Sequence, residues 1–138
     1  IRVAVRKCSL LMLAFSVVAA VVMFLFGEEV IGIFLDNPSA AVMEAAHLYI
    51  LYTVPMYFFL SQIFIYRNAC QGMGVGMIPM LSGVIELIMR SLAAIYLSEP
   101  YGYVGICLAE PVAWISCAVF VFAAYHYFVR LLEKKCLA

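Results

Sequence analysis

The chain has 138 residues, of which 68% are hydrophobic and 12% are charged, and its formal net charge is zero. A soluble globular domain is usually about half apolar and about one quarter charged, so this composition excludes an ordinary soluble domain and indicates a membrane protein. The balanced charge gives no sign of a nucleic-acid partner.

Four apolar blocks predict an all-α integral membrane fold with four transmembrane helices. The blocks cover about residues 8–27, 45–66, 78–97 and 103–128. Each is about as long as a helix must be to cross ~30 Å of hydrocarbon at 1.5 Å per residue. The blocks are too long for strands and lack the alternation of a transmembrane β-barrel.

The first block, Cys8 to Gly27, carries no charge. The segment "EEVIGIFLD" after it has apolar residues between Glu28 and Asp36. It predicts either an amphipathic stretch that lies in the membrane interface or an extension of the first helix. The sequence Asp36-Asn37-Pro38-Ser39 has turn chemistry and predicts a break before the second block.

The second block carries Pro55 near its middle. A proline inside a membrane helix bends it and frees backbone carbonyls, so we expect a kink that takes part in gating or only in packing. Tyr57, Ser61 and Gln62 follow the proline closely, and Tyr57 and Ser61 share one helical face. These three residues are candidates for a substrate or ion pathway.

The third block contains two charges, Glu86 and Arg90, in an otherwise apolar run. Gly72, Gly74 and Gly76 predict a turn before it, and Pro79 suits a first helical turn. Glu86 and Arg90 are spaced i, i+4, so they share a face and can pair. Either charge alone near the membrane centre costs ~2.5–3.5 kcal/mol on an insertion scale. The pair therefore predicts either a lock between helices or a part of the pathway.

The fourth block begins after Glu99-Pro100-Tyr101-Gly102, which predicts another break. It contains Glu110, which has no basic residue one turn away on the same helix, and we expect an unpaired carboxylate. Pro111 follows directly and frees the carbonyl of Cys107, so it is a second kink and gating candidate. Glu110 predicts either a cation or proton site or an interfacial residue.

Charged residues at the ends of the blocks predict the orientation in the membrane. Basic residues precede the first block, follow the second and follow the fourth, whereas the other two connections carry only acidic residues. The positive-inside rule then places both termini and the connection that begins at Arg67 in the cytoplasm. We expect a multi-pass protein of the cell membrane with the lipid bilayer as its partner. The basic residues that support this orientation are Arg2, Arg6, Lys7, Arg67, Arg130, Lys134 and Lys135.

No pattern in the sequence indicates enzyme chemistry. The glycines at 72, 74 and 76 follow a membrane helix rather than a strand, and no P-loop Lys-Ser/Thr comes after them. The five cysteines, at positions 8, 70, 107, 117 and 136, lack the spacing of a metal site. We expect no catalytic residue, no bound metal and no cofactor.

Several segments in a fixed order resemble the multidrug and toxic compound extrusion (MATE) transporters. The first two are "IGIFLDNPSAAVMEAAHLYILYTVPMYFF" at 31–59 and "YRNACQGMG" at 66–74. "MIPMLSGVIELIMR" at 77–90 and "YGYVGICLAEPVAW" at 101–114 follow. The resemblance extends over nearly the whole chain and matches the C-terminal part of these transporters.

The resemblance implies a twelve-helix transporter of two six-helix lobes, of which residues 1–138 are the C-terminal part of the second lobe. The sequence begins with Ile1 rather than Met, which also favours a piece of a longer protein. The N-terminal lobe and two further helices would then be absent from the piece and would be partners of these four helices. The implied function is secondary active antiport, which exports organic, often cationic drugs and toxic compounds in exchange for Na⁺ or H⁺.

Some members of the family carry an acidic cation ligand in the helix that matches the second block, and this sequence has none there. A cation site must therefore use Glu86, Glu110 or residues elsewhere, and both Na⁺ and H⁺ stay open. One alternative is a flippase for lipid-linked oligosaccharides of the same superfamily, although such proteins favour strongly basic cavities. Another is a small membrane scaffold subunit that transports nothing.

Overall fold

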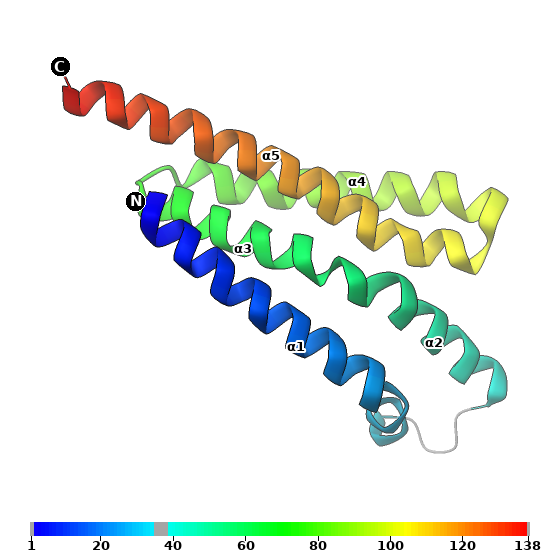
Figure 1. Cartoon of the computed structure of the whole chain (residues 1–138). Coiled ribbons are helices and arrows are strands. Elements are labelled where there is room, and N and C mark those ends of the chain that lie inside the picture. The colour runs from blue at the N-terminus through cyan, green and yellow to red at the C-terminus, as the bar shows by residue number, and fades with distance from the viewer. Residues whose placement is uncertain (1, 35–38, 138) are drawn as a thin grey trace.

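The computed structural model describes residues 2–34 and 39–137, and of residues 28, 34 and 135–137 it describes only the backbone. The described residues form five α-helices and one short 3₁₀ turn, with no strand among them (Figure 1). The elements are α1 (Arg2–Phe34), α2 (Ala40–Thr53), η1 (Val54–Met56), α3 (Tyr57–Gly72), α4 (Met77–Tyr101) and α5 (Tyr103–Leu137).

Four segments in the described part of the chain are long and apolar enough to cross a membrane. They are Arg2–Gly27, Ala40–Gly72, Met77–Tyr101 and Tyr103–Lys134. Each contains one of the four blocks predicted from the sequence. The expected all-α membrane fold with four spans is therefore confirmed, although the helices extend beyond the apolar blocks, because helical hydrogen bonding continues into the polar flanks.

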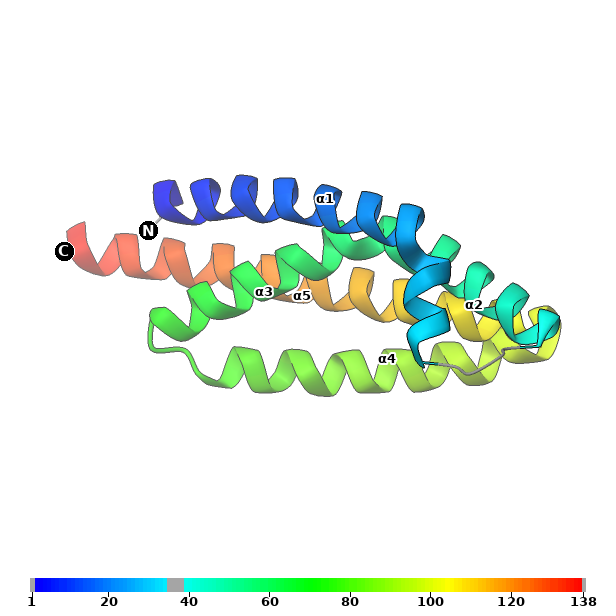
Figure 2. The ribbon, with the colours of Figure 1, turned by 90° about the horizontal axis from the view of Figure 1, so that it is seen from below.

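The segment after the first block continues as helix up to Phe34. This agrees with an extension of the first helix, and Figures 1 and 2 show that the last turns of α1 change direction relative to the rest of it. Residues 35–38, which include most of the expected break before the second block, lie outside the described residues. At its start, α2 is preceded by extended Ser39, whose carbonyl accepts hydrogen bonds from the Val42 and Met43 amides at 3.0 and 3.1 Å.

Pro55 breaks the second span, as the sequence predicts. It lies in η1, the 3₁₀ turn that separates α2 from α3. Proline has no N–H to donate to the carbonyl four residues earlier, here that of Leu51, so the α-helical pattern cannot pass through it. The Tyr57 amide bonds instead to the carbonyl of Val54, three residues earlier. The chain then resumes as α3.

The two later connections are tight turns with glycine in a left-handed conformation. Gly74 has a φ of +81° between α3 and α4, and Gly102 has a φ of +57° between α4 and α5. Pro79 lies in the first turn of α4, as expected. The break predicted over residues 99–102 is found at Gly102, although α4 continues through Pro100 as far as Tyr101. Glycine has no Cβ, so it adopts this conformation without steric cost.

The most buried helix is α5, which packs against α2, α3 and α4 (Figures 1 and 2). From Trp114 to Val129 its buried side chains recur every three or four residues, as expected for one helical face. Two core clusters lie along this face. The first contains Ile63, Trp114, Cys117 and Val121, and the second contains Cys70, Ile78, Tyr125 and Val129.

Pro111 does not break α5. The helix is continuous from Tyr103 to Leu137 with the proline inside its first third. Pro111 has no N–H to donate to the carbonyl of Cys107, so one hydrogen bond is missing there while the helix continues on both sides. Pro111, a kink candidate in the sequence, therefore leaves its helix unbroken, whereas Pro55 breaks the second span.

Candidate functional site

Glu86 and Arg90 form an ion pair on α4, as their spacing predicts. The Arg90 Nη2 atom lies 3.0 Å from Glu86 Oε1. Both residues lie near the middle of a helix that runs from Met77 to Tyr101. The pair therefore places two opposite charges well away from the helix ends.

Arg90 has a second partner on the next helix. Its Nη2 atom lies 2.8 Å from Glu110 Oε2 of α5. The expectation that Glu110 is unpaired is therefore wrong, because its partner is on α4 and not on its own helix. The hairpin at Gly102 makes α4 and α5 antiparallel neighbours, and this brings position 110 beside position 90.

Arg67 extends the cluster to α3. The sequence indicates a residue in a connection, but α3 continues to Gly72 and contains Arg67. Its Nη2 atom lies 3.3 Å from Glu86 Oε2 and also donates to Cys117 Sγ at 3.6 Å. Sequence reasoning missed this residue as a site candidate. The sequence could have predicted that Arg67 is part of the helix, since no helix breaker occurs between Tyr66 and Gly72.

We name Arg67, Glu86, Arg90 and Glu110 the ion-pair cluster. Its charges alternate in sign across α3, α4 and α5, and their sum is zero. The side chains of Arg67, Glu86 and Glu110 are 20–23% exposed, whereas that of Arg90 is 42% exposed. Partial burial strengthens each attraction relative to bulk water and makes each unpaired charge more costly. The cluster therefore holds three helices together and is sensitive to the loss of one member.

The cluster also has unused hydrogen-bonding capacity. The Nε atoms of Arg67 and Arg90 are buried, and no acceptor among the described residues bonds to them. A buried donor without a partner is costly, and such groups are often found at functional sites. Two arginines thus bind carboxylates through Nη2 while each keeps a further donor free.

The three other candidates on α3 are not in the ion-pair cluster. Ser61 is buried, and its hydroxyl donates to the Phe58 carbonyl at 2.7 Å. Tyr57 packs against Trp114 with ring centroids 6.3 Å apart. Both residues line a hollow of about 230 Å³ that faces α1, so the predicted shared face is confirmed. Their hydroxyl groups are therefore separate from the charged residues.

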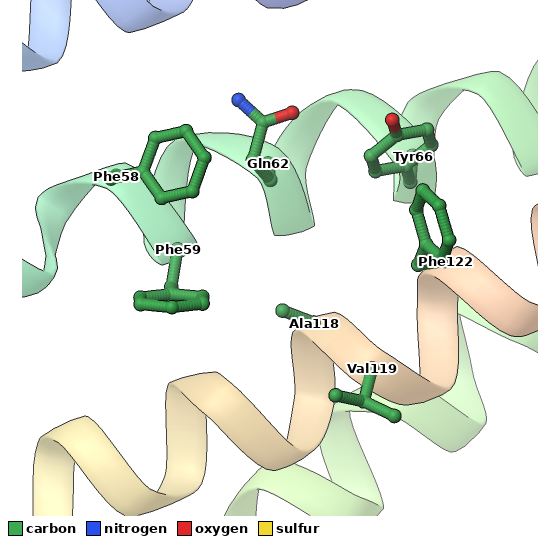
Figure 3. A pocket seen from close by; sticks show the side chains of 7 residues that line it. All are labelled: Phe58, Phe59, Gln62, Tyr66, Ala118, Val119 and Phe122. Carbon is green, nitrogen blue, oxygen red and sulfur yellow. The ribbon is translucent and has the colours of Figure 1, made fainter.

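Gln62 links α3 to α1. Its Oε1 atom accepts a hydrogen bond from the Ser9 hydroxyl at 2.6 Å. Figure 3 shows the amide directed away from the α5 side chains Ala118 and Val119. Gln62 therefore contributes a contact between α3 and α1.

An aromatic pocket lies between α3 and α5, and the sequence did not indicate it. Its volume is about 320 Å³ (Figure 3). Phe58 and Phe59 meet edge to face at 5.4 Å between centroids, and Tyr66 and Phe122 do so at 5.3 Å. Phe58, Gln62 and Tyr66 are spaced four residues apart, so they share one helical face. This spacing was the feature of the sequence that could have predicted the pocket. The lining residues are Phe58, Phe59, Gln62, Tyr66, Ala118, Val119 and Phe122.

Comparison with known proteins identifies the family. No match was found among curated proteins or among solved structures. The sequence model of the MatE family matches residues 1–97, more than half of the chain, and this confirms the resemblance seen in the sequence. The matched part contains Arg67, Glu86 and Arg90, whereas Glu110 lies beyond it. The chain belongs to the MatE family, a family of multi-pass membrane transporters.

Proposed function

We propose that the chain is part of a secondary active antiporter that exports organic cations in exchange for Na⁺ or H⁺. Membership of the MatE family supports transport in general. The ion-pair cluster supports coupling to a cation, and the aromatic pocket supports an organic cation as the substrate.

The observation that carries the proposal is the double pairing of Arg90. Its guanidinium binds Glu86 on its own helix at 3.0 Å and Glu110 on α5 at 2.8 Å. A proton or Na⁺ that neutralised Glu110 would compete with Arg90 for the same carboxylate, and Arg90 would keep Glu86. Ion binding would then remove an attraction between α4 and α5, which is the differential interaction that coupling requires.

The charge of the cluster gives no support to an anionic substrate. Two arginines are balanced by two glutamates, so these residues present no net positive charge to an anionic lipid-linked sugar. The aromatic pocket suits the other class of substrate, because aromatic faces attract organic cations within about 6 Å. We therefore prefer drug and toxin export to the lipid-flippase alternative.

The experiment uses the whole protein in proteoliposomes with ethidium as the transported cation. Uptake is driven by an imposed Na⁺ gradient or pH gradient, and ethidium binding is measured separately in detergent. Glu110→Gln keeps the shape and hydrogen bonding of the residue but can neither release a proton nor attract Na⁺. We expect this variant to bind ethidium and to lose gradient-driven transport.

Glu99→Gln is the matched control, since it makes the same chemical change at an exposed residue near the end of α4. It should transport like the parent protein. Gradient-driven transport by Glu110→Gln with the parent's response to pH and Na⁺ would contradict the role of Glu110. A parent protein that moves ethidium under neither gradient would contradict the antiport proposal and favour the scaffold or flippase alternative.

A further inference from the structure

The first turns of α1 and the last turns of α5 form one basic surface. Arg2, at the start of α1, contacts Glu133 of α5, with 2.8 Å between Nη2 and Oε2. Figures 1 and 2 show both chain ends at the same end of the helix bundle. We name this surface the basic end. Its exposed cationic residues are Arg2, Arg6, Lys7, Arg130 and Lys134.

Most of the positive charge at the basic end is not balanced by the protein. Arg2 is paired with Glu133. The described part of the chain shows no ion pair for Arg6, Lys7, Arg130 or Lys134. The exposed acids Glu29, Glu44 and Glu99 belong to the segments at the opposite end of the bundle. Their described positions are the last turns of α1, the first turns of α2 and the last turn of α4.

The basic end is also at the depth where lipid head groups are expected. α5 has 35 residues, so it is about 52 Å long and exceeds the ~30 Å hydrocarbon core of a bilayer. The exposed Tyr127 precedes Arg130 by slightly less than one turn, and tyrosine is enriched at membrane interfaces. On α1, Arg6 and Lys7 directly precede the uncharged stretch that begins at Cys8. The cationic groups therefore flank apolar spans on both helices.

We propose that the basic end binds the head groups of anionic phospholipids. The phosphodiester oxygens accept hydrogen bonds from the guanidinium groups of Arg6 and Arg130 and from the ammonium groups of Lys7 and Lys134. The contact between Arg2 and Glu133 shows that the two helix ends lie side by side, so that one lipid patch can contact both. Clusters of basic residues beside a membrane span attract anionic lipids in this way. The proposal is independent of the transport function proposed above.

The test measures lipid selectivity with the whole protein in nanodiscs. Spin-labelled phosphatidylglycerol and spin-labelled phosphatidylcholine are compared by the fraction that the protein immobilises in an otherwise phosphatidylcholine bilayer. Both leaflets have the same composition, so the result does not depend on orientation. We expect phosphatidylglycerol to be preferred by about threefold or more at low salt. The fourfold variant Arg6→Gln, Lys7→Gln, Arg130→Gln and Lys134→Gln should lose this preference.

The matched control is the threefold variant Glu29→Gln, Glu44→Gln and Glu99→Gln, which should keep the preference. The comparison of the two labelled lipids on the parent protein at low and high salt tests the proposal even if a variant does not fold. In about 1 M salt the Debye length falls to about 3 Å, so the preference should largely disappear. A preference that survives high salt, or that the fourfold Gln variant retains, would overturn the proposal. Displacement of the labelled lipid by millimolar inorganic phosphate would also overturn it in favour of a free-phosphate site.

Discussion

At the scale of single residues, the ion-pair cluster makes a prediction that differs from that of an isolated pair. Arg90→Met leaves Glu86 with Arg67 but leaves Glu110 without a partner. Breaking a buried ion pair from one side usually costs about 3–5 kcal/mol, and the 42% exposure of Arg90 places this case near or below the lower limit. We expect a clear fall in the thermal unfolding midpoint of the detergent-solubilised protein.

Two double variants show which carboxylate depends on Arg90. Arg90→Met with Glu110→Gln leaves an intact Arg67–Glu86 pair and should recover most of the loss. Arg90→Met with Glu86→Gln leaves both Arg67 and Glu110 without partners and should recover little. Equal recovery in the two double variants would show that the cluster does not act as described. The exposed Arg2–Glu133 pair is the control, and its double Gln variant should change stability by less than about 1 kcal/mol.

At the scale of the helices, Gly105 sets the contact between α4 and α5. A Cβ atom at this position would overlap the carbonyl of Leu97 and would lie 2.9 Å from the Ser98 nitrogen. Backbone atoms cannot move aside as a flexible side chain can, so Gly105→Ala must separate the two helices. We expect a loss of about 3 kcal/mol or more, at the upper end of overpacking costs, measured as a lower unfolding midpoint.

Gly83→Ala is the matched control for Gly105→Ala. It makes the same substitution inside α4, where no atom lies within 4 Å of the added Cβ. The variant should be as stable as the parent or more stable by up to about 1 kcal/mol, because Ala favours helix more than Gly. A destabilisation equal to that of Gly105→Ala would show that close packing is not the cause.

The break at Pro55 gives a second prediction at this scale. Pro55→Ala restores an N–H that can donate to the Leu51 carbonyl, so α2 and α3 can join into one α-helix. If the break shapes a moving gate, the variant should insert normally but change the rate of ethidium transport. Pro111→Ala is the comparison variant, because α5 is already continuous at this position. Ethidium transport by Pro111→Ala should change less than transport by Pro55→Ala. Parent-like transport by Pro55→Ala would assign the break to packing alone.

At the scale of the whole molecule, the charge distribution predicts its orientation. Arg67 is a member of the ion-pair cluster and no longer counts as a connection charge, but the basic residues at both chain ends remain. In a background without Cys8 and Cys136, Glu99→Cys should react with a membrane-impermeant thiol reagent added outside sealed cells. Gln71→Cys and Lys134→Cys should react only after the cells are opened. Reaction of Gln71→Cys with the reagent added outside sealed cells would show that the orientation is opposite to the predicted one.

The sequence by itself determined the spans, the two turns between them that are described, and the pairing within α4. These features depend on residues close together in the chain. A long apolar stretch predicts a membrane helix whatever its neighbours, glycines predict the turn before α4, and the missing N–H of Pro55 breaks its own helix. Glu86 and Arg90 are one turn apart, so their contact follows from helical geometry alone.

Only the tertiary structure decided which charges meet across helices. Glu110 looks unpaired because its partner, Arg90, is on α4, and the close approach at Gly105 brings the two helices together. Arg67 joins Glu86 because α3 continues past the apolar block, and side-chain packing between α3 and α5 also forms the aromatic pocket. Such contacts join residues far apart in the chain, and helix periodicity does not state which faces of different helices pack against each other.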